Sequence, residues 1–171
     1  MMKKLLLFIA LLFSLSAAKS QVLHVKGVEG TFLEVNHEKA GIGLGIGYYK
    51  IQTKKLLWKA MGETHFSTQG NTKTRIYNAF GEVGYTVYSF KQQLFLSVTG
   101  GLGMGAESML DRITDRTKSR FVLMESVGLS VEYCILEQLT ATLNFRQRFL
   151  QFNNNGVALY QVGIGLQYNF K

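Results

Sequence analysis

The sequence has no proline, only one cysteine and, beyond residue 20, no apolar run long enough for a membrane-spanning helix. The single cysteine, Cys134, excludes an internal disulfide, so burial and backbone hydrogen bonds must stabilise the fold. The absence of proline suits hydrogen-bonded strands, because proline removes a donor from the ladder. These absences argue against a disulfide-stapled domain and a helical membrane protein, and they favour an all-β chain.

The first twenty residues have the pattern of a secretory signal peptide. Two lysines precede an apolar run at residues 5–15, and Ala18-Lys19-Ser20 supplies small residues at a cleavage site. The run is short for a bilayer span, so an uncleaved anchor helix is the less favoured alternative. We therefore expect residues 1–20 to be a cleaved leader and residues 21–171 to form one exported domain.

The charge pattern gives no support for nucleic-acid binding or for a metal site. The net charge is +8, and three of the lysines lie in the leader. The remaining charges are spread along the chain without a basic stripe interleaved with aromatics. Histidine and cysteine show no ligand spacing, so we expect neither a cofactor nor direct contact with nucleic acid.

Eight segments alternate apolar and polar residues with the period of two that is typical of strands. The last is the most regular, with five apolar residues from Val162 to Phe170 on one face and Gly, Gln and Asn on the other. Asn153-Asn154-Asn155-Gly156 before it is a hairpin-turn signal. The expected strands are 27–35, 41–51, 56–66, 75–88, 94–104, 121–133, 139–149 and 162–170.

The connections differ in length in the way that is typical of an up-and-down membrane barrel. Ser67–Lys73 and Glu107–Arg120 are expected as long loops, while the second, fourth and sixth connections are short turns. A soluble barrel would show the same alternation with its apolar face inside. Glycine on the polar face, aromatics at strand ends and strands of about ten residues, which span about 25 Å when tilted, favour the membrane barrel. The prediction is an eight-stranded antiparallel up-and-down transmembrane β-barrel in the outer membrane, closed by its first and last strands.

In this geometry the polar face points into the lumen, where opposite charges neutralise each other and form a plug instead of a pore. In the first strand, Glu29 is expected inside, and Val28 and Phe32 outside. Glu125 falls on the apolar face, near an interface or beside a bulge. The predicted lumen charge network consists of Glu29, Lys59, Glu63, Glu82, Glu132, Arg146 and Arg148.

Two other groups of residues could carry catalysis or contact a protein partner. His65 lies beside Glu63 on the lumen face, but no serine is placed near it, so a lumen pair is favoured over a lipid-modifying hydrolase and no catalytic residue is predicted. The segment Glu107–Arg120 is either a solvated loop or a contact surface for a protein partner. Its candidate partner residues are Asp111, Arg112, Asp115, Arg116, Lys118 and Arg120.

The last strand resembles the assembly signal of Gram-negative outer-membrane barrels, with Leu166, Tyr168 and Phe170 on its apolar face. Lys171 departs from that pattern, which normally ends on the aromatic residue. The resemblance implies recognition by the barrel-assembly machinery and contact with outer-membrane lipid.

A second resemblance covers most of the expected domain. It rests on Lys26-Gly27-Val28-Glu29, Trp58 with Glu63 and His65, Glu82-Val83-Gly84-Tyr85, and Gly163-Ile164-Gly165-Leu166-Gln167-Tyr168-Asn169-Phe170. In these residues the chain resembles the TraO proteins, which are small exported proteins encoded in conjugative transposons of Bacteroidetes-type bacteria. This resemblance implies a non-enzymatic part in conjugative DNA transfer, with other conjugation proteins as partners; a general envelope or adhesion barrel is the alternative.

Overall fold

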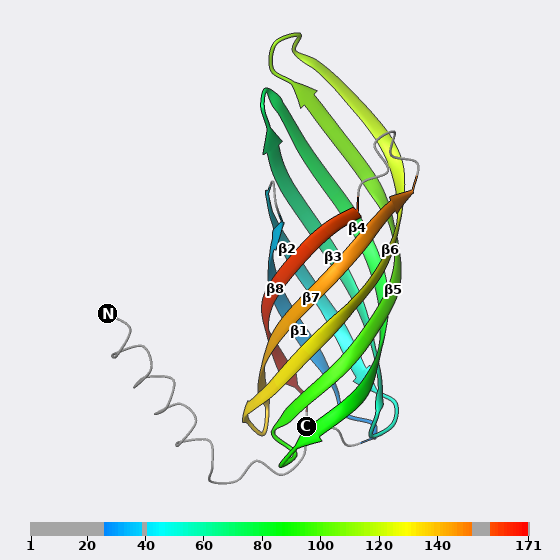
Figure 1. Cartoon of the computed structure of the whole chain (residues 1–171), viewed down its shortest axis with the longest axis vertical. Helices are drawn as coiled ribbons and strands as arrows, with labels where there is room; N and C mark the ends of the chain where they lie inside the picture. Colours follow the sequence, from blue (N-terminus) through cyan, green and yellow to red (C-terminus); the bar gives the residue numbers. More distant parts are fainter. Residues whose placement is uncertain (1–25, 39–40, 152–157, 171) are drawn as a thin grey trace, which may run out of the picture.

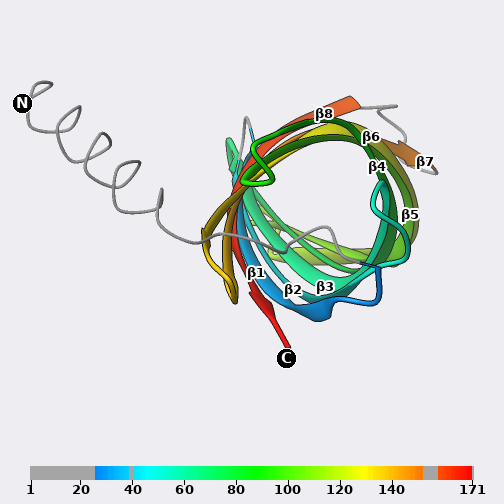
Figure 2. The same cartoon turned by 90° about the horizontal axis from the view of Figure 1, so that it is seen from below.

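The chain folds into one closed antiparallel β-barrel. The computed structural model describes residues 26–38, 41–151 and 158–170, so the expected leader, the Asn-rich turn and Lys171 lie outside the described residues. Each strand pairs with its neighbours in the chain, and β8 pairs with β1 to close the ring (Figures 1 and 2). The strands are β1 (Glu29–Glu38), β2 (Gly41–Ile51), β3 (Leu56–Gln69), β4 (Thr72–Phe90), β5 (Leu94–Asp111), β6 (Arg116–Leu136), β7 (Leu139–Gln151) and β8 (Ala158–Asn169).

The predicted eight-stranded, all-β, closed architecture is confirmed. Within the described ranges, no helix is long and apolar enough to cross a bilayer.

The strands are unequal in length, and the prediction of two long loops is wrong, because most of both segments belongs to strands. β4, β5 and β6 contain 19, 18 and 21 residues, whereas β1 and β8 contain 10 and 12. Ser67–Lys73 is reduced to the turn at Gly70 and Asn71, and Glu107–Arg120 to the turn at residues 112–115. The backbone ladder continues through these polar residues, which lack the apolar contrast that marks a strand in a sequence. Both hairpins rise beyond the rest of the barrel (Figure 1).

The outer wall is apolar and the inner wall carries the buried polar residues. On β2, Ile42, Leu44 and Ile46 are 52–62% exposed, and the apolar residues of β8 from Val162 to Tyr168 also face outward. Glu125 lies on the outer face too, where it accepts a hydrogen bond from Gln151 Nε2 at 2.6 Å. The pairing of β6 is regular at Glu125, which excludes the bulge considered for it. The prediction of which residues face the lumen and which face outward is therefore confirmed for β2 to β8.

The expected facing of β1 is wrong. Phe32 and Glu34 are 4% and 3% exposed inside the barrel, whereas Leu33 and Val35 are 61% and 48% exposed outside. The register explains this phase, because Leu33 lies opposite Ile46 of β2 and Leu166 of β8, which both face outward. The prediction took Val28 and Phe32 as outward-facing apolar residues, and a segment this short fits either alternation.

The lumen also contains an apolar cluster that the sequence analysis did not predict. The ring of Phe80 of β4 lies over Gly103, which is opposite it on β5, and over the neighbouring Gly101, and the guanidinium carbon of Arg148 is 5.1 Å from the centre of this ring. The lumen is therefore filled by apolar contacts as well as by charges. The buried members of the cluster are Phe32, Tyr49, Ile51, Leu57, Met61, Ile76, Phe80, Val122, Met124 and Leu150.

Glycines on the inner wall make room for the larger side chains. A Cβ atom added to Gly43 would lie 2.5 Å from His65 Nδ1, and one added to Gly163 would lie 2.0 Å from Asn36 Oδ1. The glycine-rich inner face of β2 and β8 is therefore a packing requirement, as the sequence indicated. Gly62 on the outer face of β3 has nothing within 4 Å of the corresponding position.

Gly43→Ala should destabilise the folded barrel, because His65 is held between two carboxylates and cannot move away freely. Overpacking of this kind lowers the free energy of unfolding by about 1–3 kcal/mol. The matched control is Gly62→Ala, which should change it by less than about 0.5 kcal/mol. Urea unfolding in detergent or lipid, followed by tryptophan fluorescence, measures both. Equal stability of the two variants would contradict the packing role of Gly43.

Candidate functional site

An arginine inside the lumen connects three strands through its ion pairs. Arg146 of β7 places Nε 2.8 Å from Glu82 Oε2 of β4 and Nη2 3.2 Å from Glu34 Oε2 of β1. Arg146 Nη1 also contacts Glu34 Oε1, so the pair with Glu34 is bidentate. Asn144 Nδ2 donates to Glu34 Oε2 at 2.7 Å. The ion pairs cross the lumen and connect strands that are not neighbours in the sheet.

A second group lies one step further along β7, toward the end with the long hairpins. Arg148 Nη2 donates to Glu63 Oε1 at 2.7 Å, and Nη1 lies 2.7 Å from Glu63 Oε2. The ring of His65 lies between two carboxylates, with Nδ1 3.1 Å from Glu38 Oε1 and Nε2 3.2 Å from Glu63 Oε2. Gln161 Nε2 donates to Glu38 Oε1 at 3.2 Å.

A third pair lies toward the opposite end of the barrel. Lys59 Nζ is 3.4 Å from Glu132 Oε1, and Gln167 Nε2 donates to the same oxygen at 3.5 Å. Lys59, Arg146 and Arg148 thus each contact a carboxylate, which offsets the cost of burying their charge. Paired side chains fill the barrel at three successive levels.

The structure places six residues of the predicted network inside the barrel: Lys59, Glu63, Glu82, Glu132, Arg146 and Arg148. The prediction that Glu29 lies in the lumen is wrong. Glu29 is the first residue of β1, and 41% of its side chain is exposed. Its carboxylate lies 3.1 Å from Lys50 Nζ and accepts a hydrogen bond from the Tyr48 hydroxyl.

Sequence reasoning missed Glu34 and Glu38, which take the place of Glu29 in the network. The missed signal is the outward pair Leu33 and Val35. Had their alternation set the phase of β1, both acids would have fallen on the inner face.

The surroundings of His65 are those of an ion-pair network. Both ring nitrogens face carboxylates, and Arg148 Nη1 is 3.1 Å from Nε2. Among the described residues, no serine or threonine hydroxyl is a hydrogen-bond partner of this ring. In the same ranges, no group of three or more His, Cys, Asp and Glu side chains is placed to hold a metal ion.

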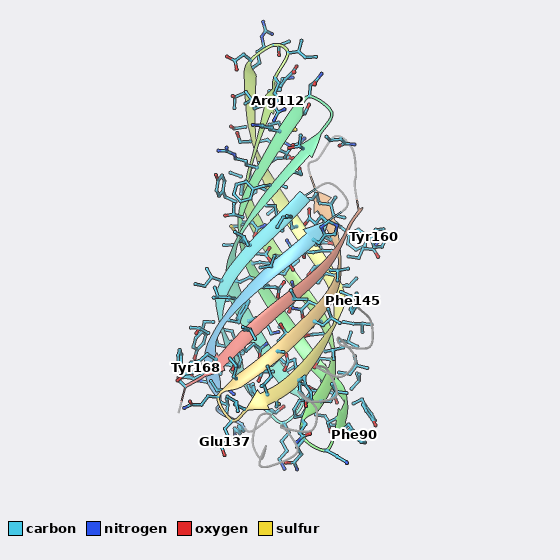
Figure 3. All side chains as sticks on the ribbon, turned by 90° about the vertical axis from the view of Figure 1, so that its left-hand side faces the viewer. Phe90, Arg112, Glu137, Phe145, Tyr160 and Tyr168 are labelled. Atoms are coloured by element: carbon cyan, nitrogen blue, oxygen red, sulfur yellow. The ribbon has the colours of Figure 1, made fainter. Side chains whose placement is uncertain are left out.

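The candidate partner residues lie on a β-hairpin and not on a loop. Asp111 ends β5, Arg112 and Asp115 lie in the turn, and the other three lie on β6. Arg112 is at the apex, far from Phe90 and Glu137 at the opposite end (Figure 3). Arg116, Lys118 and Arg120 share the face of β6 that continues the inner wall, because Val122 and Met124 on that face are buried.

The hairpin tip is held by hydrogen bonds to one carboxylate. Asp111 Oδ1 accepts from the Ile113 backbone N–H, and Oδ2 from the Thr114 hydroxyl, both at 2.9 Å. These bonds hold the pKa of the Asp111 carboxyl below its usual value. The Arg112 backbone N–H donates to the Asn71 carbonyl at 3.0 Å, which ties the β5–β6 turn to the β3–β4 turn. Arg120 pairs with Glu107 on β5.

The proposed assembly-signal residues are exposed on the outer wall. Leu166, Tyr168 and Phe170 are 50%, 48% and 46% exposed, and the rings of Tyr168 and Phe170 meet edge to face at 6.3 Å. The Phe170 backbone N–H donates to the Glu29 carbonyl at 2.8 Å, so the end of the chain is fastened to β1. Recognition of this strand by assembly machinery stays a prediction.

Arg146→Met should be the most damaging charge change in the lumen, because it leaves Glu34 and Glu82 buried without their cation. Removing one partner of a buried pair costs about 3–5 kcal/mol of unfolding free energy. The control Arg112→Met, at the exposed apex, should change it by less than about 0.5 kcal/mol.

The triple change Arg146→Met, Glu34→Gln and Glu82→Gln should recover much of the loss, because no unpaired charge then remains. Urea titration of the folded barrel checks all three proteins. If Arg146→Met is as stable as Arg112→Met, the central ion pairs do not hold the barrel together.

No protein-family model and no curated protein matches the sequence. Several solved structures with a similar fold are outer-membrane barrels. The N-terminal β-barrel domain of OprF from Pseudomonas aeruginosa has a TM-score of 0.64 at 12% identity, over 85% of this chain and 98% of that one. Neisserial surface protein A, NspA, has a TM-score of 0.66 at 11% identity, over 84% and 95%.

Ail, the attachment invasion locus protein of Yersinia pestis, has a TM-score of 0.52 at 13% identity, over 85% of this chain and all of that one. Identities this low establish shared architecture and nothing finer. The chain therefore has the fold of small outer-membrane β-barrels.

Proposed function

We propose that this chain is a non-enzymatic outer-membrane barrel that acts as an interaction protein through its β5–β6 hairpin. The observation that supports this most strongly is the combination of an apolar outer wall with a filled lumen and a charged hairpin that extends beyond both. A filled lumen leaves the exterior as the surface on which a partner can act.

The membrane placement rests on the outer wall. Large apolar residues are exposed around the whole ring of strands, which is unfavourable in water and favourable in lipid. Phe145, Tyr160 and Tyr168 point away from the barrel on the side shown in Figure 3. The fold shared with OprF, NspA and Ail supports the same placement.

The β5–β6 hairpin is suited to contact a partner because its shape is fixed. The backbone ladder runs to Asp111 and Arg116, and Asp111 holds the turn through two hydrogen bonds. A preformed surface loses little conformational entropy on binding. Its exposed charges, such as Arg112 and Lys118, can give orientation and specificity to an encounter.

The resemblance to TraO proteins supports a place for this hairpin in a conjugation apparatus. In that setting the barrel anchors the hairpin at the outer membrane, and other conjugation proteins are its partners. His65 gives no support to a lipid-modifying reaction, since its ring nitrogens face Glu38 and Glu63. The proposed role is therefore structural.

Neutralising the hairpin should lower the frequency of conjugative transfer. We expect the variant Arg112→Gln, Arg116→Gln and Lys118→Gln to reduce mating about tenfold or more, because three charges guide and hold the partner. The control variant Lys54→Gln and Lys55→Gln removes charges at the opposite end of the barrel and should mate normally. A wild-type mating frequency in a donor that carries the hairpin variant would rule out this role of the hairpin. A normal mating frequency after deletion of the gene would rule out any conjugative role.

A second candidate is an adhesion barrel, which one neighbour favours. Ail has been solved in complex with the heparin analogue sucrose octasulfate. The three basic residues on one face of β6 have the charge to contact a sulfated glycan. Saturable binding of immobilised heparin that is lost in the hairpin variant, together with normal mating, would support adhesion in place of conjugation.

A further inference from the structure

We propose that Lys73 and Arg75, on the outer face of β4, bind a headgroup phosphate of a phosphorylated glycolipid in the outer leaflet. The proposal rests on the outer-membrane placement argued above. It concerns the outside of the wall formed by β3 to β6, whereas the partner surface concerns the hairpin tip and its inner face.

The strand alternation places both cations on the outside. Lys73 and Arg75 are exposed, as are Tyr77 and Ala79 further along the same face, whereas Ile76 and Asn78 between them are buried in the lumen. Both side chains thus point away from the barrel. In the described ranges neither makes an ion pair.

Exposed aromatic side chains lie beside these cations on the wall. Phe66 of β3, Tyr77 of β4 and Phe121 of β6 are exposed by 44%, 49% and 56%. Toward the centre of the barrel the outer face continues with Ala79, Val83 and Met104. Exposed aromatics at the end of an apolar band mark the boundary between hydrocarbon and headgroups.

Arg75 and Lys73 lie two and four residues beyond Tyr77. At about 3.4 Å per residue and a tilt near 45°, they stand about 5 and 10 Å past Tyr77, at the depth of lipid headgroups.

The neighbours of the two cations are suited to hold a phosphate. In the register, Arg75 lies between Phe66 of β3 and Ser108 of β5, and Ser108 lies opposite Ser119 of β6. Lys73 lies opposite Thr68 of β3. These residues alternate onto the same outer face, so each cation has one hydroxyl neighbour, Ser108 for Arg75 and Thr68 for Lys73. Arginine binds phosphate through two parallel hydrogen bonds, and lysine adds a point charge.

Among the described residues, the acid on the outer face of β3 to β6 is Glu125, which lies opposite Leu102, six residues along β5 from Ser108, and accepts a hydrogen bond from Gln151 Nε2. The acids of β5, Glu107 and Asp111, occupy the other face of that strand, where Glu107 pairs with Arg120 and Asp111 caps the turn. The outer face therefore has a local charge of +2 at headgroup depth. The exposed apolar band toward the centre of the barrel matches the acyl chains of a lipid, and the pair of cations beyond it matches a phosphorylated headgroup.

The test compares two forms of one lipid. Wild-type protein folded in detergent micelles is titrated with bisphosphorylated lipid A and with the same lipid after dephosphorylation, and native mass spectrometry gives both affinities. We expect the phosphorylated form to bind about 30-fold more tightly, since each cation near a membrane surface contributes about a fivefold factor. The variant Lys73→Gln and Arg75→Gln should lose this preference, while the control Lys54→Gln and Lys55→Gln should keep it.

Folding of each variant is checked first by the shift in gel mobility on boiling. If the double variant does not fold, Arg75→Gln alone should lose about fivefold of the preference. An unchanged preference in the folded variants, or none in the wild type, overturns the site. Displacement of the lipid by millimolar inorganic phosphate also overturns it, because the anion would then bind without the membrane. Failure of the wild type to insert into lipid vesicles would overturn the membrane placement together with the site.

Discussion

The backbone pairing between β1 and β8 is the interaction on which the rest of this structure depends. The pairs run from Gly30 opposite Asn169 to Glu38 opposite Gln161, and they leave the sheet without an open edge. Only a closed sheet satisfies its own backbone groups, so only a closed sheet can present an apolar wall to lipid. The same pairing fixes the phase of β1 and turns Glu34 and Glu38 into the lumen.

Closure also determines how the interior is filled. An eight-stranded ring has little room, so large charged side chains require glycine on the neighbouring strand, as at Gly43 beside His65. Arg146 bridges β1 and β4 across the lumen, and Arg148 lies against both Glu63 and the ring of Phe80. Charge pairing and packing are therefore one system, in which the loss of a cation leaves carboxylates that have no route to water.

The number of strands, their closure and the inner face from β2 to β8 could be predicted because alternation and turn signals are local properties of the sequence. The phase of β1 could not, since a short strand beginning near Val28 and Phe32 fits both phases until its partners are known. The hairpins were missed because Lys73 and Lys118 lie in ladders that have no apolar contrast. Which charges pair across the lumen depends on the closure of the ring. The alternation along each strand shows only that a side chain faces the lumen, not which side chain it meets there.

The central claim is that the outer face of the barrel meets lipid, and spin-label accessibility tests it most directly. Single cysteines at Ile46, Val83 and Ile164, in a Cys134→Ala background, would carry nitroxide labels in the refolded, vesicle-inserted protein. If the outer face meets lipid, oxygen reaches all three labels and a water-soluble nickel chelate does not, while a label at the exposed hairpin residue Ile113 is reached by the chelate. Equal access of the chelate to all four positions would contradict the membrane barrel.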